Sequence, residues 1–258
     1  MEKLGSKYLS KLCRFYLFYY SNPEGDFETN GEANLIRTYA RMAHNPVVFD
    51  VGSNHGEWAL TAAKHMPDAR IHAFEIAPQT YELGEKALRG YKNIIANPFG
   101  LGKEAGTVRL IFHPQNDTLT TTIPNIEIHD SLGEPKIFDA RVETGDGYCH
   151  RAGIDQIGLL KIDVEGAEGH ILDGFKTLLE RQAIDVIQFE YGIANIFSET
   201  LLYSLYERLV PHGYQIGRLS RRGVGFAEYK WTMENFTGPN YVAVHISNLS
   251  LIDALRAH

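Results

Sequence analysis

The sequence contains little cysteine and no long apolar run. Cys13 and Cys149 are the two cysteines among 258 residues, and their spacing matches neither a disulfide framework nor a cysteine-based metal site. No segment approaches the roughly 18–20 consecutive apolar residues of a membrane-spanning helix. The first absence excludes a disulfide-stapled fold and favours a reducing compartment, so we expect a cytoplasmic protein. The second predicts no helical membrane span.

Positive charge is also scarce. The chain has 25 Lys and Arg residues against 32 Asp and Glu residues, which gives a formal net charge of −7 at pH 7. This balance excludes a broad phosphate-binding surface, so we expect no nucleic-acid partner.

Four basic residues lie close together near the N-terminus among leucines and aromatic residues, at Lys3, Lys7, Lys11 and Arg14. The apolar stretch there is short and no small-residue cleavage site follows it, which argues against a signal peptide. A basic aromatic helix could contact a membrane surface peripherally. The alternative, which we favour, is a helix that packs over the core or onto a second subunit of an oligomer.

The chain length suits one α/β domain with a substantial core. Apolar runs that predict strands alternate with helical patterns, as is typical of a parallel sheet; these runs span residues 47–51, 70–75, 93–96, 157–162 and 183–189. Ser198 is predicted to cap a later helix. Residues 106–144 resemble β-strands and loops, which indicates a β-rich insertion that could act as an acceptor-binding lid. We divide the chain into an N-terminal helix and loop, residues 1–30, and one domain, residues 31–258.

The most informative stretch is residues 46–58, PVVFDVGSNHGEW. A buried strand runs through Asp50 into a turn that contains Gly52, Asn54 and Gly56, and a helical pattern follows. Turns of this kind bind nucleotides in α/β sheets, because glycine lets a ligand approach the backbone closely. Glu75 ends the next predicted strand, about 20 residues beyond the turn, where a carboxylate can accept hydrogen bonds from both ribose hydroxyls.

The turn favours S-adenosylmethionine over NAD. The third glycine of a dinucleotide-binding turn is missing, and Asp50 would oppose a pyrophosphate. The same negative charge suits a cationic ligand that carries an amino acid group. A nicotinamide-dependent oxidoreductase and a catalytically silent binding module remain the alternatives.

A second motif, residues 159–168 (LLKIDVEGAE), delivers three acids from the end of a buried strand. Together with residues 48–56 (VFDVGSNHG), 74–78 (FEIAP), 209–214 (LVPHGY) and 240–244 (NYVAV), it resembles the FkbM family of class I methyltransferases. The resemblance covers roughly residues 30 to 247, and the fourth-strand motif is its most specific part.

The resemblance implies a Rossmann-like, mostly parallel seven-stranded sheet with helices on both faces and the last strand antiparallel. It also implies S-adenosylmethionine as donor and O-methylation of a hydroxyl on a sugar, glycan or natural product, so the expected partner is a carbohydrate or small-metabolite acceptor. Carried over by position, its donor-binding residues are Asp50, Gly52, Asn54 and Gly56 around the methionine part, Glu75 at the ribose, and Phe99 and Gly100 beside the adenine. Asp163 would face the methyl group.

The acceptor hydroxyl must lose a proton, and the sequence offers two ways to remove it. Asp163 or Glu165 could act as a general base, with His55 or His170 as lesser candidates. Alternatively, Asp163 and Glu190 could hold a divalent cation that lowers the pKa of the hydroxyl. We favour the direct base. Glu165 and Glu168 could also simply complement a helix N-terminus.

Overall fold

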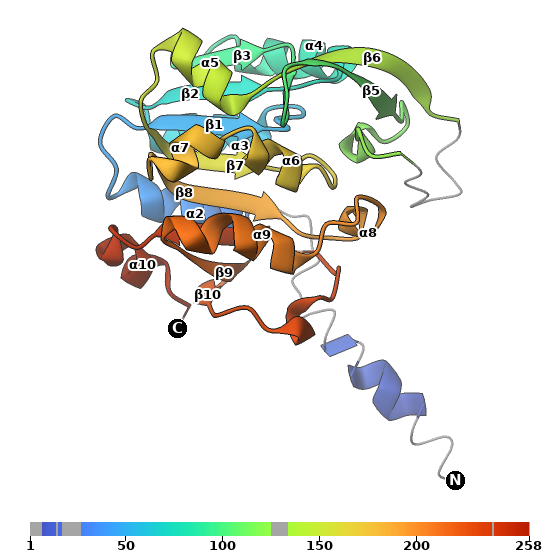
Figure 1. Ribbon diagram of the computed structural model, residues 1–258, viewed down its shortest axis with the longest axis vertical. Helices are drawn as coiled ribbons and strands as arrows, with labels where there is room; N and C mark the ends of the chain where they lie inside the picture. The colour runs from blue at the N-terminus through green and yellow to red at the C-terminus, as the bar shows by residue number, and fades with distance from the viewer. Residues whose placement is uncertain (1–6, 14, 17–26, 125–133, 239, 258) are drawn as a thin grey trace.

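The computed structural model describes residues 7–13, 15–16, 27–124, 134–238 and 240–257. Its centre is one sheet with the strand order β10-β9-β11-β8-β7-β1-β2-β3 (Figure 1). The strands are β1 Val47–Val51, β2 Arg70–Phe74, β3 Ile94–Asn97, β7 Ile157–Ile162, β8 Ile184–Glu190, β9 Tyr214–Ser220, β10 Gly223–Phe226 and β11 Asn240–His245.

The sheet reverses direction beside β1. The chain builds β1, β2 and β3 outward to one side and then returns to place β7 on the other side of β1, and all these neighbours are parallel. Such a reversal leaves a crevice at the carboxyl ends of the two strands that flank it, which is where open α/β sheets bind ligands. The topology therefore places the glycine turn after β1 and the acidic motif after β7 side by side.

The predicted sheet is confirmed in its main features, and its strand count needs a correction. As expected, β11 is antiparallel to both of its neighbours, β8 and β9. The described residues contain eight strands in this sheet rather than seven. The eighth is β10, which pairs with β9 as a hairpin because Ser220 and Gly223 face each other across a tight turn.

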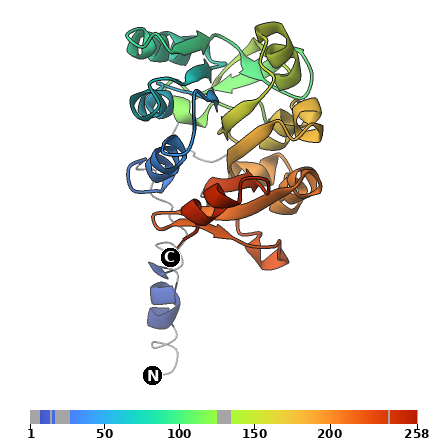
Figure 2. The same cartoon turned by 90° about the vertical axis from the view of Figure 1, so that its left-hand side faces the viewer.

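Helices cover both faces of the sheet (Figure 2). One face packs against α2 Glu32–Ala40, α3 Glu57–His65, α4 Pro78–Leu88 and α10 Leu249–Leu255. The other packs against α5 Gly145–Ala152, α6 Glu168–Asp173, α7 Lys176–Glu180 and α9 Leu202–Leu209. All six residues of β7 are buried, as expected for a central strand covered on both sides.

The short helix α8 Ala194–Phe197 corrects one prediction. Ser198 follows the end of α8 instead of capping the next helix, which begins at Leu202. The free amides of Leu202 and Tyr203 donate to the carboxylate of Glu234, at 3.0 and 2.9 Å. The carboxylate of Glu234, which is distant in the sequence, therefore accepts the hydrogen bonds that an N-cap side chain usually accepts.

The segment between β3 and β7 is β-rich, as predicted. A separate three-stranded sheet is formed by β4 Gly100–Leu101, β6 Lys136–Glu143 and β5 Gly106–Phe112, in that order. The short 3-10 helix η1 Asp117–Leu119 follows β5. The Asp117 carboxylate accepts a hydrogen bond from the Thr80 hydroxyl and lies within hydrogen-bond distance of His55 Nε2, which places η1 over the glycine turn.

The described residues of the N-terminal helix do not pack over the core. Residues 7–13 are helical and exposed, with Tyr8, Leu9 and Leu12 more than half accessible. Contact of this helix with a second subunit or a membrane surface stays a prediction. Nowhere in the described ranges does a helix combine the length and apolar character needed to cross a bilayer.

Candidate functional site

The glycine turn brings the ends of three strands together. Gly52 and Gly56 adopt φ values of 75° and 85°, in the left-handed region that favours glycine. A Cβ on Gly52 would lie 1.8 Å from the carbonyl oxygen of Asp163, so the close approach of β1 and β7 requires glycine here. The amides of Gly52 and Ser53 donate to the carbonyl of Phe74, which ties the turn to the end of β2.

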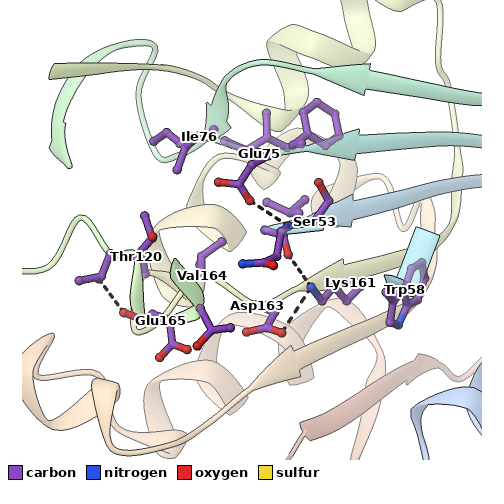
Figure 3. A pocket seen from close by; sticks show the side chains of 18 of the residues that line it. Ser53, Trp58, Glu75, Ile76, Thr120, Lys161, Asp163, Val164 and Glu165 are labelled. Atoms are coloured by element: carbon purple, nitrogen blue, oxygen red, sulfur yellow. Dashed lines mark hydrogen bonds and ion pairs between the residues drawn. The ribbon is translucent and has the colours of Figure 1, made fainter. Parts of the chain in front are cut away.

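A cavity of about 400 Å³ lies against this turn. Its walls come from the carboxyl ends of β1, β2 and β7, from the start of α2, and from the insertion around η1. Figure 3 shows Ser53 at its centre, with Glu75 and Ile76 on one side and Lys161, Asp163 and Trp58 on the other. The volume falls within the range of about 300–1,000 Å³ that is usual for small-ligand sites.

Glu75 lines the cavity at the end of β2. Its carboxylate accepts hydrogen bonds from the amides of Asn54, at 2.9 Å, and Ala77, at 2.8 Å. Burial raises the pKa of Glu75, and these two amide hydrogen bonds oppose the rise. A carboxylate has about four acceptor positions, so Glu75 retains capacity for ligand hydroxyls.

Lys161 is the buried cation beneath the turn. Its Nζ donates to the carbonyl of Gly52 at 2.7 Å and lies 3.2 Å from Asp50 Oδ1 and 3.3 Å from Asp163 Oδ2. Burial lowers the pKa of Lys161, but Asp163, Asp50 and Glu32 outweigh it, so the net shift is upward. The ammonium therefore stays charged and joins the ends of β1 and β7.

Asp50 is fully buried in this arrangement and does not line the cavity. Burial raises its pKa, and the neighbouring Lys161 opposes that rise. The prediction that Asp50 wraps the methionine part therefore disagrees with its position, because its carboxylate faces Lys161 inside the protein. The sequence showed an acid before the turn but not the lysine that pairs with it.

Asp163, Glu165 and Glu190 form an acidic cluster at the ends of β7 and β8. One carboxylate oxygen from each lies within 4.8 Å of the others. The pKa of Glu165 is raised to about 8 by burial, then by the charges of Asp163 and Glu168. Burial, followed by Asp163 and Glu165, raises the pKa of Glu190 well above its ordinary value. This group can hold a proton or a cation, so the Asp163–Glu190 cation site stays a prediction.

Glu168 supports the loop instead of facing the cavity. Its Oε1 accepts from the amides of Gly166 and Val164, at 3.0 and 3.3 Å, and its Oε2 accepts from the Asn195 side chain at 3.0 Å. Its carboxylate thus fixes the turn between β7 and α6. His170 is exposed on α6 and does not line the cavity.

The remaining predicted donor-site residues divide into two groups. Gly52, Asn54 and Gly100 line the cavity, whereas Gly56 and Phe99 do not. The Phe99 ring packs in the core against Phe74 and Tyr148, with ring centroids 5.8 and 6.0 Å apart, and its expected place beside the adenine stays a prediction. Ile76 and Leu101 are the apolar side chains at that end of the cavity.

The insertion covers the open side of the turn. Asp117 Oδ2 lies 2.9 Å from His55 Nε2 and accepts a hydrogen bond from the Thr80 hydroxyl at 3.1 Å. The hydroxyl of Thr121 donates to the carbonyl of Glu165 at 2.8 Å. His55 therefore holds the insertion in place over the turn.

The sequence analysis missed the contribution of the segment before β1. Phe27 and Glu32 both line the cavity. A helix that runs into the first strand must begin at the edge of the sheet where the glycine turn lies, and this signal could have identified Glu32. The presence of Phe27 in the wall also shows that part of the proposed 1–30 segment contributes to the site.

A doubly wound sheet with a glycine turn, an acid-ended second strand and an acidic fourth-strand loop at its switch point defines a Rossmann-like class I methyltransferase fold. The family model described as the methyltransferase FkbM domain matches residues 50–215. The chain belongs to this family.

Curated relatives are distant and carry methyltransferase names. Methyltransferase sdnD of Sordaria araneosa is 31% identical over 166 residues, which cover 52% of this chain and 62% of the relative. The 31-O-demethyl-FK506 methyltransferase FkbM of Streptomyces tacrolimicus is 31% identical, covering 54% of this chain and 63% of the relative. Hexuronic acid methyltransferase AglP of Haloferax volcanii is 27% identical, covering 64% and 65%. The alignments thus span somewhat less than two thirds of these relatives.

Proposed function

We propose that this protein transfers a methyl group from S-adenosylmethionine to a hydroxyl of a sugar, glycan or natural-product acceptor. One observation carries the proposal: a cavity at the switch point joins an apolar end, the buried carboxylate of Glu75 and an acidic end. A nucleoside with a cationic amino acid tail matches that sequence of environments. The names of the FkbM and AglP relatives, which refer to an O-demethyl substrate and to hexuronic acid, support a hydroxyl acceptor.

In this proposal, different residues around the cavity bind different parts of the donor. Ile76, Gly100 and Leu101 would enclose the adenine, and Glu75 would bind the ribose hydroxyls. Gly52 and Asn54 would let the amino acid part approach the backbone. The donor supplies an already activated methyl group, so the protein mainly has to align the two substrates, which is worth up to about 7–11 kcal/mol in ideal cases.

The acidic cluster handles the acceptor proton. Asp163 lines the cavity with about 38% of its side chain exposed, and Lys161 stabilises its negative charge. Glu165 holds a proton below a pH of about 8 because of burial and its acidic neighbours. We therefore assign Asp163 as the general base rather than Glu165, which already holds a proton near neutral pH. General bases typically contribute about 100- to 10,000-fold in rate.

Isothermal calorimetry with S-adenosylmethionine, S-adenosylhomocysteine and NAD tests the donor, and radiolabelled methyl incorporation into cell-derived glycans and small metabolites tests the acceptor. We expect both sulfur ligands to bind, NAD not to bind, and label to enter an oxygen-linked methyl group. Binding of NAD without either sulfur ligand would indicate an oxidoreductase. Donor binding with label found only on nitrogen or carbon would overturn the O-methylation part.

A further inference from the structure

The two ends of the cavity differ in charge. Ile76 and Leu101 stand at one end, beyond Glu75. At the other end lie Trp58, Lys161 and Asp163, which Figure 3 shows on the opposite side of Ser53 from Ile76. Glu32 lines this second end and comes from the first residue of α2, not from the sheet.

Glu32 is held rigidly and is mostly buried. About 8% of the residue is exposed. Its Oε2 accepts from the Gln188 side chain at 2.6 Å, and its Oε1 accepts from the Asn30 side chain at 2.6 Å. Gln188 is itself oriented by Trp58 Nε1, which donates to its Oε1 at 3.3 Å. The carboxylate is thus aimed by side chains from β8 and from the loop before α2.

The partners of Glu32 are neutral. Within the described ranges, no lysine, arginine or histidine forms an ion pair with it, whereas Asp50 and Asp163 share Lys161. Two hydrogen bonds leave about two acceptor positions of the carboxylate unused. A buried carboxylate without a cation is costly, and a cationic ligand group would relieve that cost.

Burial raises the pKa of Glu32, and the nearby Asp163 raises it further. A positive charge beside the carboxylate would reverse both effects. The positive charge of Lys161 lowers the pKa of Glu32 but only partly offsets the effect of burial. Lys161 already contacts Asp50, Asp163 and the Gly52 carbonyl.

We infer that Glu32 binds the α-ammonium group of the donor and thereby selects ligands that carry this group. The inference rests on the proposed function and deepens it, because it assigns the amino acid end of the donor to a residue outside the glycine turn. Glu32 takes the place that the sequence suggested for Asp50.

The test uses the full chain and three ligands in calorimetry. These are S-adenosylhomocysteine, its analogue with a hydroxyl in place of the α-amino group, and 5′-methylthioadenosine, which lacks the amino acid part. Wild-type protein should prefer S-adenosylhomocysteine over the hydroxyl analogue by at least about tenfold, as for one charge-assisted hydrogen bond. Glu32→Gln should abolish this preference and leave the Kd for methylthioadenosine within about twofold.

Glu28→Gln is the matched control. Glu28 is exposed, pairs with Arg37 and does not line the cavity, so the variant should retain the wild-type preference. Methylthioadenosine binding also reports whether the variant pocket is folded. If Glu32→Gln does not bind methylthioadenosine, Glu32→Asp is the second variant. Its shorter side chain moves the charge away from the cavity, so it should show a reduced preference for S-adenosylhomocysteine over the hydroxyl analogue.

A preference that persists in these variants would overturn the role of Glu32, as would an equal loss of affinity for all three ligands in a folded variant. Failure of the wild-type protein to bind any adenosyl ligand would instead overturn the proposed donor. The two failures are therefore distinguishable.

Discussion

Lys161 is the residue on which the charge balance of the site depends. It is the cation that contacts both Asp50, which is fully buried, and Asp163, which faces the cavity. Removing one partner of a buried pair leaves an uncompensated charge and is strongly destabilising.

Lys161→Met should therefore lower the free energy of unfolding by about 3–5 kcal/mol, as measured by urea denaturation. The control Lys176→Met removes an exposed lysine on α7 and should change stability by no more than about 0.5 kcal/mol. A loss of under about 1 kcal/mol in Lys161→Met would mean that Asp50 is neutral without its partner.

Asp163 is predicted to act on the acceptor rather than on donor affinity. Asp163→Asn should lower kcat by at least about 100-fold and leave the Kd for S-adenosylhomocysteine nearly unchanged. Steady-state kinetics and calorimetry measure the two quantities, and Asp155→Asn, at an exposed position, is the control. Equal losses in both would make Asp163 a donor ligand. Activity that EDTA abolishes and Mg²⁺ restores would favour the Asp163–Glu190 cation site.

Glu165 should make stability depend on pH. Its folded-state pKa is about 8, raised from 4.5 mainly by burial. A carboxyl with a raised folded pKa binds more protons in the folded state than in the unfolded state between these values, so stability falls as pH rises from about 4.5 to 8. Tm should therefore decrease more between pH 5.5 and pH 8 in wild type than in Glu165→Gln. Parallel curves for the two proteins would contradict the raised pKa.

At the scale of elements, the carboxylate of Asp117 holds η1 over the glycine turn. Asp117 receives hydrogen bonds from Thr80 of α4 and contacts His55 of the turn, and it lines the cavity. Residues of the turn and of the insertion therefore line one cavity, whereas the sequence suggested only an acceptor-binding role for this segment.

Asp117→Ala should release η1. We expect faster amide hydrogen exchange in residues 117–121 and a donor Kd raised by several-fold, because two side-chain contacts are lost. Asn116→Ala is the matched control, since the Asn116 side chain accepts a hydrogen bond from the neighbouring Thr118 within the insertion itself. Unchanged exchange in Asp117→Ala would mean that packing, not Asp117, holds the insertion.

At the scale of the whole molecule, the donor cavity connects elements that are far apart in the sequence. Its walls include Phe27, Glu75, Asp117 and Asp163, which belong to separate elements. A ligand that fills the cavity should therefore stabilise the fold as a whole by mass action.

S-adenosylhomocysteine at 100 times its Kd should add about 2.7 kcal/mol to the free energy of unfolding, which corresponds to a rise in Tm of roughly 5–10 °C. Differential scanning fluorimetry measures this shift, and NAD at the same concentration is the control. A shift with NAD alone would contradict the assignment of the donor.

The sequence by itself determined the features that depend on local chemistry. The buried strands Val47–Val51 and Ile157–Ile162 appear as apolar runs, and the positions of Gly52 and Gly56 mark the turn because their left-handed φ values favour glycine. Glu75 could be located because a strand end after such a turn lies at the ligand crevice. These signals depend on neighbours in the sequence, so they can be read before the chain folds.

Only the tertiary structure decided which acids face the cavity. Asp50 and Glu32 are both buried carboxylates, but Lys161 from β7 holds Asp50 beneath the turn, while Gln188 from β8 aims Glu32 into the cavity. Phe99 lies in the core because Phe74 and Tyr148 surround it. These outcomes depend on contacts between residues that are distant in the sequence, and no local pattern encodes them.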